Sequence, residues 1–353
     1  MSSRRPERVL IVPIFIPNQG CPHQCIFCDQ EKITDQSAPP AGPAYIKQII
    51  HTALNSKDFF YKKRREVAFY GGTFTGLGAG KISELLSAVT PFIDQGLFQS
   101  IRISTRPDEI DDERLEMIRN LGVTTIELGV QSMDDNVLML SRRGHTSKHT
   151  TDAVGLLKKH GFKIGIQLMP GLPGDSGSGF ADTVEKVVNL APDFTRLYPA
   201  LVIKGTALAR FYDNGRYTPL TLEQAIEICR DSCLRLEGQG ISVIRIGLMS
   251  SPSLLEDGQI LAGPWHTAFG FLVRSSIFLK GIRRMLPKPG EADMIGLRLR
   301  ERDIPLLRGY RNQGVNRLEE VIKSKIIYIK GDDSVLEGEV EVDFIHRPFN
   351  LNN

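Results

Sequence analysis

The sequence predicts an α/β fold, an open six-stranded partial (β/α) barrel followed by a smaller α+β C-terminal region. Six short apolar segments alternate with helical segments along residues 9–199, and such alternation requires a parallel sheet with crossover helices. Glycine-rich or polar residues follow these segments, at the strand ends where α/β folds bind ligands. A chain of 353 residues suits one large α/β domain with an appendage. We therefore assign residues 1–215 to the barrel core and 216–353 to an α+β extension.

The expected strands are apolar segments that end in turn-forming residues. They cover residues 9–16, 66–70, 100–105, 125–130, 163–169 and 194–199. The helices expected between them cover residues 45–55, 81–95, 112–121, 150–160 and 180–190. The helix near residue 112 has the clearest signals, because Asp111 or Asp112 can cap its start and Gly122 follows its end. Beyond residue 215 we expect a helix over 222–237, a strand over 242–247 and a less regular tail.

The bulk composition indicates a cytoplasmic protein. No apolar run reaches the roughly 20 residues that span a bilayer, and no signal-peptide cleavage site is evident near the N-terminus. Three of the five cysteines fall close together, which favours metal ligation in a reducing compartment over a disulfide framework. The net charge of +3 does not by itself indicate nucleic-acid binding.

The clustered cysteines are Cys21, Cys25 and Cys28, spaced C-x3-C-x2-C directly after the first expected strand. Three thiolates at this spacing can bind zinc or an iron–sulfur cluster. A structural zinc site needs a fourth ligand. His23 is the available candidate, but it lies two residues from each flanking cysteine in a cramped loop, and no second cysteine pair follows. An iron–sulfur cluster with a vacant coordination position is favoured, and zinc remains the alternative.

This motif resembles the hallmark of the radical S-adenosylmethionine superfamily, in which an aromatic residue precedes the last cysteine, as Phe27 does here. The resemblance implies that the three thiolates bind three irons of a [4Fe-4S] cluster and that S-adenosylmethionine binds the fourth. It also implies reductive cleavage of S-adenosylmethionine to a 5′-deoxyadenosyl radical, with an electron donor similar to flavodoxin or ferredoxin. The chemistry then belongs to the cofactor, and the protein orients and shields it.

Further positions resemble cofactor-binding residues of this superfamily. The turn Gly71-Gly72-Thr73 is similar to a Gly-Gly-Glu turn that receives the methionine amino group, with Thr in place of Glu. Gln131 and Arg143 are similar to residues that contact the ribose and the methionine carboxylate in the coproporphyrinogen-dehydrogenase-like branch. Ser104 and Gln167 stand where that branch has carboxylates. The resemblance thus implies cofactor binding by Phe27, Gly71, Gly72, Thr73, Ser104, Gln131 and Arg143.

The chain resembles most the radical domain of the Elongator catalytic subunit, which modifies the wobble uridine of tRNA. The similar stretches are residues 71–74, 104–108, 127–132, 143–146 and 197–206, within residues 8–250. In that branch the radical acts on an acetyl group from acetyl-CoA. No Gln-x-x-Gly-x-Gly loop for acetyl-CoA occurs in this sequence, and we expect no complete acetyltransferase domain. The resemblance therefore implies the cofactors but leaves the substrate open.

Several other residues have both a structural and a functional interpretation. Lys204 and Tyr198 lie either at a strand end or in the substrate cavity. Cys229 and Cys233 lie on a helical apolar stripe, which favours buried core residues over a second cluster. The segment around Trp265 is either a packed hinge or a cover for the barrel.

Basic residues form five separate clusters, for which solvated surface is the default interpretation. They are Arg4-Arg5, residues 62–65, Arg142-Arg143, Arg283-Arg284, and Lys323 with Lys325. If they converged on one face, they could neutralise RNA phosphates. We therefore expect a cytoplasmic radical S-adenosylmethionine enzyme with tRNA as a candidate substrate. The alternatives are a small-molecule or porphyrin substrate, and a zinc-stabilised RNA-binding module without catalytic activity.

Overall fold

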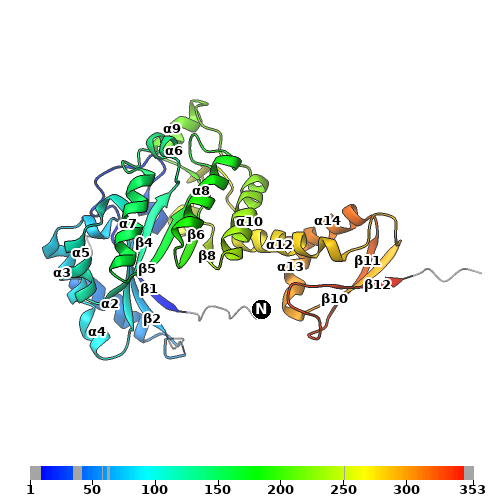
Figure 1. The fold of residues 1–353 in the computed structure, drawn as a ribbon, viewed down its shortest axis with the longest axis horizontal. Helices are drawn as coiled ribbons and strands as arrows, with labels where there is room; N and C mark the ends of the chain where they lie inside the picture. The colour runs from blue at the N-terminus through cyan, green and yellow to red at the C-terminus, as the bar shows by residue number, and fades with distance from the viewer. Residues whose placement is uncertain (1–8, 35–41, 58, 62–63, 250, 346–353) are drawn as a thin grey trace, which may run out of the picture. The chain divides into compact units, whose positions relative to one another are not determined.

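The computed structural model describes residues 9–34, 42–57, 59–61, 64–249 and 251–345. Its main feature is a curled, parallel, seven-stranded half-barrel covered by helices (Figure 1). The strands, in spatial order, are β1 (Leu10–Phe15), β2 (Arg65–Tyr70), β3 (Ser100–Thr105), β4 (Val123–Gln131), β5 (Lys163–Leu168), β6 (Phe194–Leu197) and β8 (Ser242–Ile246). The inner strands read as apolar runs because a parallel sheet is buried on both faces.

The prediction of six strands is wrong by one. The strand expected over 242–247 was assigned to the C-terminal extension, but β8 pairs in parallel with β6, from Phe194 opposite Ser242 to Leu197 opposite Ile246. Helix α10 (Leu222–Gly238) lies between these strands in the sequence and supplies the crossover that a parallel pair requires. The barrel therefore extends one strand further than the sequence pattern indicated.

The helices that accompany this sheet follow the expected alternation. They are α1 (Gln30–Thr34), α2 (Pro43–Leu54), α3 (Ala79–Ser87), α4 (Thr90–Asp94), α5 (Asp112–Asn120), α6 (Asp135–Leu140), α7 (Ser147–Lys159), α8 (Gly177–Leu190), α9 (Ala207–Asp213) and α11 (Pro252–Leu255). The single helix expected over 81–95 is two helices, with Pro91 in the first turn of α4, where proline is tolerated. As predicted, Asp111 caps α5 by accepting a hydrogen bond from the Arg114 N–H at 2.8 Å.

The chain forms two compact units. The first comprises residues 1–225 and 235–265, and the second comprises residues 226–234 and 266–353. The first unit contains the half-barrel and a short antiparallel pair, β7 (Val202–Ile203) with β9 (Ile260–Ala262). These units do not test the domain boundary that we predicted at residue 215, which therefore stays a prediction.

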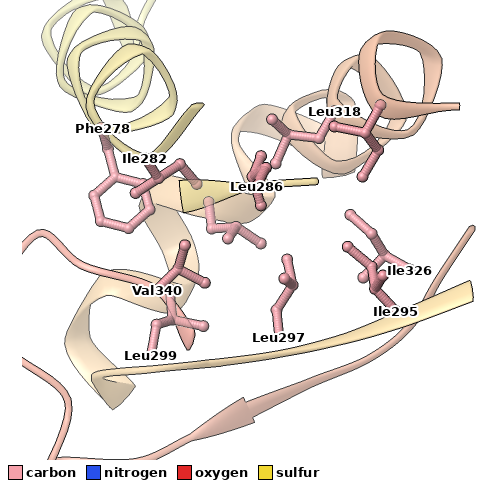
Figure 2. Close-up of a cluster of buried hydrophobic side chains, with 11 residues drawn as sticks. Phe278, Ile282, Leu286, Ile295, Leu297, Leu299, Leu318, Ile326 and Val340 are labelled. Carbon is pink, nitrogen blue, oxygen red and sulfur yellow. The ribbon is translucent and has the colours of Figure 1, made fainter. Parts of the chain in front are cut away.

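The second unit has its own apolar core. Its elements are α12 (Phe269–Ile282), β10 (Met294–Leu299), α13 (Ile304–Arg308), α14 (Gln313–Ile322), β11 (Lys325–Gly331) and β12 (Glu341–Ile345). Strand β10 is central, parallel to β11 and antiparallel to β12. Side chains of β10 and α12, including Leu297 and Ile282, are fully buried in this core (Figure 2). Cys229 and Cys233 are fully buried too, which confirms the prediction of core cysteines.

No helix in the described parts of the chain is long and apolar enough to cross a membrane.

Candidate functional site

A cavity of about 1120 Å³ lies in the first unit, where the sheet strands end. The ten residues that the sequence predicted as cluster or cofactor ligands all line this cavity. They are Cys21, Cys25, Phe27, Cys28, Gly71, Gly72, Thr73, Ser104, Gln131 and Arg143. They are carried by the segments that follow β1, β2 and α6 and by the ends of β3 and β4. The fold thus brings together residues that lie more than 100 positions apart in the sequence.

The cysteine loop (residues 16–28) is held against the turn after β2. Gly71 has a φ of +95°, a conformation that glycine adopts without strain. Gly72 has no room for a side chain, because a Cβ there would lie 2.4 Å from the Gln19 carbonyl oxygen and 2.6 Å from that of Ile16. The Thr73 N–H donates to the Gln19 carbonyl at 2.9 Å. Both glycines therefore serve the close approach of two backbones, besides any contact with a cofactor.

The segment before α7 holds the same loop from another side. A Cβ on Gly144, whose φ is +77°, would lie 2.2 Å from the Cδ2 atom of His23. The Ile26 N–H donates to the Ser141 carbonyl at 3.2 Å, and the Ile26 carbonyl accepts from the Leu208 N–H at 2.8 Å. His23 thus packs against a glycine in this structure. The cysteine loop is held by this contact at His23 and by the backbone hydrogen bonds at Ile26.

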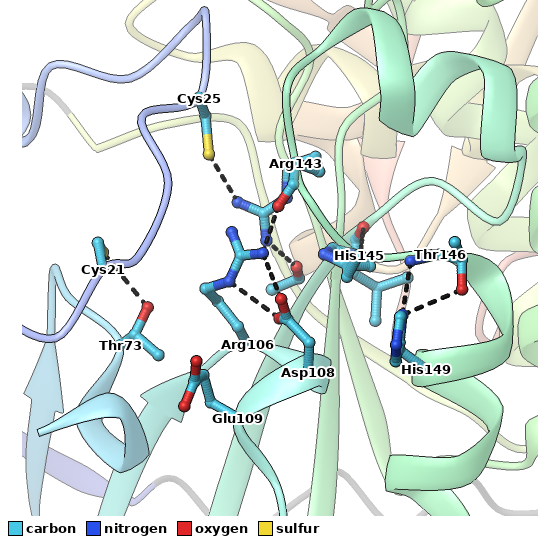
Figure 3. Close-up of polar contacts among 12 residues, drawn as sticks. Cys21, Cys25, Thr73, Arg106, Asp108, Glu109, Arg143, His145, Thr146 and His149 are labelled. Atoms are coloured by element: carbon cyan, nitrogen blue, oxygen red, sulfur yellow. Dashed lines mark hydrogen bonds and ion pairs between the residues drawn. The ribbon is translucent and has the colours of Figure 1, made fainter.

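The three cysteines are free thiols in different surroundings. The Cys21 Sγ lies 3.3 Å from the Thr73 hydroxyl, and the Cys25 Sγ accepts a hydrogen bond from Arg143 Nη1 at 3.0 Å (Figure 3). Burial raises the pKa of Cys28 to about 12; Cys25 and Cys21 add to this increase and Arg143 opposes it. Ionisation of the Cys28 thiol therefore needs a nearby positive charge.

The ligand role of these thiols stays a prediction. Within the described residues, no three His, Cys, Asp or Glu side chains form a group that could hold a metal ion.

Arg143 is buried beside the cysteine loop, with one N–H group left over. It donates to the Gly129 carbonyl as well as to Cys25, while its Nε has no hydrogen-bond partner. Arg106 donates to the Arg143 carbonyl and forms a bidentate ion pair with Asp108 at 2.9 and 2.7 Å (Figure 3). An arginine held in this way presents a fixed donor, and a carboxylate is the acceptor that its planar head group suits best.

His145 adds no charge to this region at neutral pH. Burial, and to a smaller extent the neighbouring Arg143, lower its pKa to about 3. Its Nε2 lies 3.2 Å from the Val130 carbonyl oxygen.

Gln131 closes β4 in a left-handed conformation, with a φ of +70°. Residues other than glycine rarely adopt this region, and such outliers cluster at functional sites. Its carbonyl accepts from the Met169 N–H at 2.9 Å, and its side-chain oxygen lies 3.5 Å from the Gln167 amide nitrogen. The two amides therefore lie together at the ends of β4 and β5, both lining the cavity.

The structure distinguishes between the structural and functional interpretations of the remaining candidate residues. Tyr198 lines the cavity, whereas Lys204 is exposed and lies outside its lining. This favours the strand-end interpretation of Lys204. Trp265 packs with Leu201 and Leu254 in a small apolar cluster, which favours the packed-hinge interpretation. Of the basic clusters, residues 1–8 and 62–63 lie outside the described residues.

A buried network of charges, part of which lines the cavity, was missed by the sequence reasoning. Arg102 donates to Glu66 at 2.9 and 2.7 Å and to Glu127 at 2.7 Å. Arg196 forms an ion pair with Glu127 at 2.8 Å and donates to the Tyr70 hydroxyl at 2.9 Å. The available signal was the presence of charged residues inside otherwise apolar strands. Charges in such positions are rarely buried without partners.

This fold and this cysteine-lined cavity define an enzyme class that the family comparison identifies. Residues 15–187 match the Radical SAM superfamily, and residues 192–278 match the Radical_SAM C-terminal domain. The chain belongs to the radical SAM superfamily and is an enzyme of that class.

The relatives place the chain near the Elongator branch. It is 29% identical over 248 residues to the tRNA uridine(34) acetyltransferase of Dehalococcoides mccartyi, covering 62% of this chain and 54% of that protein. It is 38% identical over 129 residues to the tRNA uridine(34) acetyltransferase of Methanocaldococcus infernus, covering 36% of this chain and 24% of the relative. The matched stretches thus span about half or less of these relatives.

A solved structure of archaeal Elp3 from M. infernus, with residues 1–46 deleted, shares the fold. It aligns with a TM-score of 0.60 and 23% identity, covering 78% of this chain and 64% of that one.

Proposed function

We propose that Cys21, Cys25 and Cys28 hold a [4Fe-4S] cluster and that S-adenosylmethionine binds beside it. The observation that carries this proposal is the convergence of the ten predicted residues on one cavity. Thiolates are the protein ligands of iron–sulfur clusters, and the high pKa of Cys28 is consistent with a site that needs positive charge to ionise this thiol. The unpartnered Nε of Arg143 suits the carboxylate of the methionine moiety.

Bound cluster and S-adenosylmethionine would together supply reductive cleavage and a radical able to abstract hydrogen from a substrate. The residues of the chain bind and orient. Arg143 presents its head group at the cysteine loop, Gln131 offers an amide for hydroxyl groups of the ribose, and Phe27 packs against the apolar residues beside the loop.

We further propose tRNA as the substrate, modified at the wobble uridine. Similarity to two tRNA uridine(34) acetyltransferases supports this proposal. An electron donor similar to flavodoxin or ferredoxin would reduce the cluster.

Anaerobic reconstitution tests the cofactor proposal. We expect about four iron atoms per chain and formation of 5′-deoxyadenosine from S-adenosylmethionine under a strong reductant. Cys25→Ala should lose both, whereas Cys229→Ala, which removes a fully buried thiol outside the site, should retain both. A colourless protein with one zinc, or full cleavage by Cys25→Ala, would overturn the cluster assignment.

Filter binding of tRNA tests the substrate proposal. Phosphate contacts make affinity fall steeply with salt, so we expect much weaker binding at about 200 mM than at about 50 mM salt. Absence of binding at the lower concentration, with cleavage of S-adenosylmethionine intact, would point to a small-molecule substrate.

A further inference from the structure

We propose that the β6–β8 end of the cavity is an anion-binding subsite in which Arg245 recognises a carboxylate or phosphate group of the substrate. Arg245 is a substrate-binding residue in this proposal, separate from the cluster and from S-adenosylmethionine. The inference rests on the proposed function only in taking the bound anion to belong to the reacting molecule.

The cavity has a second half that the proposed cofactor ligands leave free. Those ligands come from β1 to β4 and the loops beyond them. The other half is lined from β5, β6, β8 and the segments after them by Gln167, Met169, Arg196, Tyr198, Arg245, Leu248 and Met249. The volume of about 1120 Å³ exceeds the roughly 300–1,000 Å³ of a typical small-ligand pocket. There is therefore room for a second molecule beside S-adenosylmethionine.

Arg196 and Arg245 are direct neighbours across the β6–β8 pair. Opposite residues on adjacent strands share a face, and both side chains line the cavity. Like charges in this arrangement repel each other. A pair of arginines at the end of a cavity is thus expected only where negative charge compensates it.

Within the protein, the carboxylate that compensates the positive charge of this pair lies beside Arg196. Its Nε lies 2.8 Å from a Glu127 carboxylate oxygen, and its other nitrogens donate to the hydroxyls of Tyr70 at 2.9 Å and Tyr198 at 3.2 Å. Although burial opposes its charge, Glu127 raises the pKa of Arg196. Glu127 is shared with Arg102, which also pairs with Glu66. The two carboxylates face the buried guanidinium groups of Arg102 and Arg196, and Glu66 lies 3.8 Å from the more exposed Arg64 as well. The network therefore has no negative charge left over.

Among the residues that the structure describes, Arg245 has no carboxylate partner of this kind. Its hydrogen bond is a long one, from Nε to the Gly247 carbonyl at 3.4 Å. No carboxylate lies within ion-pair distance of Arg245 in the part of the chain that the structure describes. Both terminal nitrogens of this half-buried side chain can therefore bind a ligand. Carboxylate and phosphate groups suit them, because a guanidinium binds either through two parallel hydrogen bonds.

Calorimetric titration of the reconstituted enzyme, saturated with S-adenosylmethionine, tests the proposal. The two probes are methyl phosphate and malonate, at low salt. Saturation keeps the carboxylate-binding position at Arg143 occupied, so the probes report on the remaining cavity. We expect at least one probe to bind, and Arg245→Gln to weaken that binding about tenfold to a hundredfold, as for loss of a charge-assisted hydrogen bond. The probe that binds distinguishes a phosphate-bearing from a carboxylate-bearing substrate.

Two further variants separate a built site from general positive charge. Arg210→Gln removes an exposed arginine that lines the same cavity from α9, and it should change binding less than threefold, as expected for a solvated charge. Arg245→Lys keeps the charge but loses the planar fork, and it should recover binding only in part. Equal losses in Arg210→Gln and Arg245→Gln, or no binding of either probe, would overturn the inference.

Iron content and formation of 5′-deoxyadenosine without substrate provide the independent readout. Both should be unchanged in Arg245→Gln, because Arg245 lies outside the proposed cofactor ligands. Loss of anion binding with these two intact identifies the anion subsite. Absence of iron and cleavage in the wild-type enzyme would instead count against the proposed function, and titration of the protein as isolated would still test the anion subsite.

Discussion

At the scale of single residues, glycines determine how the cysteine loop meets the turn after β2. A Cβ on Gly76 would lie 2.3 Å from the Gly20 carbonyl oxygen, and a Cβ on Gly20 would lie 2.2 Å from that of Thr73. Together with Gly72, these residues let two backbones touch directly. The position of the thiols therefore depends on residues that carry no chemistry themselves.

We predict that Gly72→Ala destabilises the fold and lowers iron incorporation. The new methyl group would overlap two backbone carbonyls, and overpacking of this kind costs about 1–3 kcal/mol. Chemical denaturation of the metal-free chain measures the loss in the free energy of unfolding.

The matched control is Gly80→Ala, in helix α3. A Cβ at Gly80 meets nothing within 4 Å, so this change should raise stability by up to about 1 kcal/mol. Equal stabilities of the two variants would contradict the packing argument.

The cysteine motif and the candidate site residues could be recognised from the sequence because they are local patterns at strand ends. The left-handed φ of Gln131 could not be recognised in this way, since nothing in the neighbouring sequence requires it. The adjacency of Arg196 and Arg245 was also hidden, because it depends on the register of two strands that lie more than 40 residues apart.

At the scale of elements, the loop after β5 contains a carboxyl group with a shifted pKa. Asp175 accepts hydrogen bonds from the N–H groups of Gly171 and Ser176, both at 2.9 Å. Burial nevertheless raises the pKa of Asp175 from 3.8 to about 6. The folded protein therefore binds this proton more tightly than the unfolded chain does.

We predict that Asp175 makes the protein less stable as the pH rises from about 4 to about 6. The stabilising contribution of the protonated carboxyl is fully present below about pH 4 and is lost as the pH passes the folded pKa of about 6. Allowing for partial exposure, the change amounts to about 1–2 kcal/mol. In urea unfolding, Asp175→Asn should gain stability relative to wild type over this range, and the gain should be constant above it. A difference that does not vary with pH would refute the assignment.

The buried charge network connects four strands through Glu127. We predict that Glu127→Gln lowers the free energy of unfolding by about 3–5 kcal/mol, because Arg196 would remain buried without its carboxylate. Chemical denaturation provides the measurement.

Glu185→Gln is the comparison for a surface pair. Glu185 binds Arg235 at 2.7 Å, but both side chains are largely exposed, so the loss should stay below about 1 kcal/mol. Similar losses of unfolding free energy in both variants would show that burial does not determine how much an ion pair contributes to stability.

The helices and strands themselves were largely predictable, because period and capping signals are local. The break between α3 and α4 at Pro91 has a signal in the sequence that the apolar pattern obscured. The sequence contains no signal for the position of β8 in the sheet, because the segment 242–247 fits either a separate sheet or the edge of the barrel. Only the packing of the complete chain decides between these two.

At the scale of the whole molecule, the two units have separate cores, and the candidate site lies entirely in the first. We predict that Leu297→Ala, which empties a fully buried position in the second unit, lowers its stability by about 2–5 kcal/mol. Thermal unfolding followed by circular dichroism measures this loss.

Iron content and S-adenosylmethionine cleavage of Leu297→Ala, assayed well below its unfolding transition, should match the wild type. Ile103→Ala, in the buried core of β3 in the first unit, should lower both stability and cleavage. Loss of cleavage in folded Leu297→Ala would show that the second unit contributes to the site.

The proline in β1 has a consequence for the solubility of the whole molecule. The Leu10 N–H donates to the carbonyl of Arg64, directly before β2, and the Ile16 N–H donates to that of Tyr70 in β2. The alternation along a strand therefore directs the Pro13 nitrogen towards the opposite edge. In the described residues no strand pairs with β1 there. Unprotected edges recruit strands from other molecules, and a proline removes one of the donors that such pairing needs. The strand that leads into the cysteines is thereby protected against edge-to-edge aggregation.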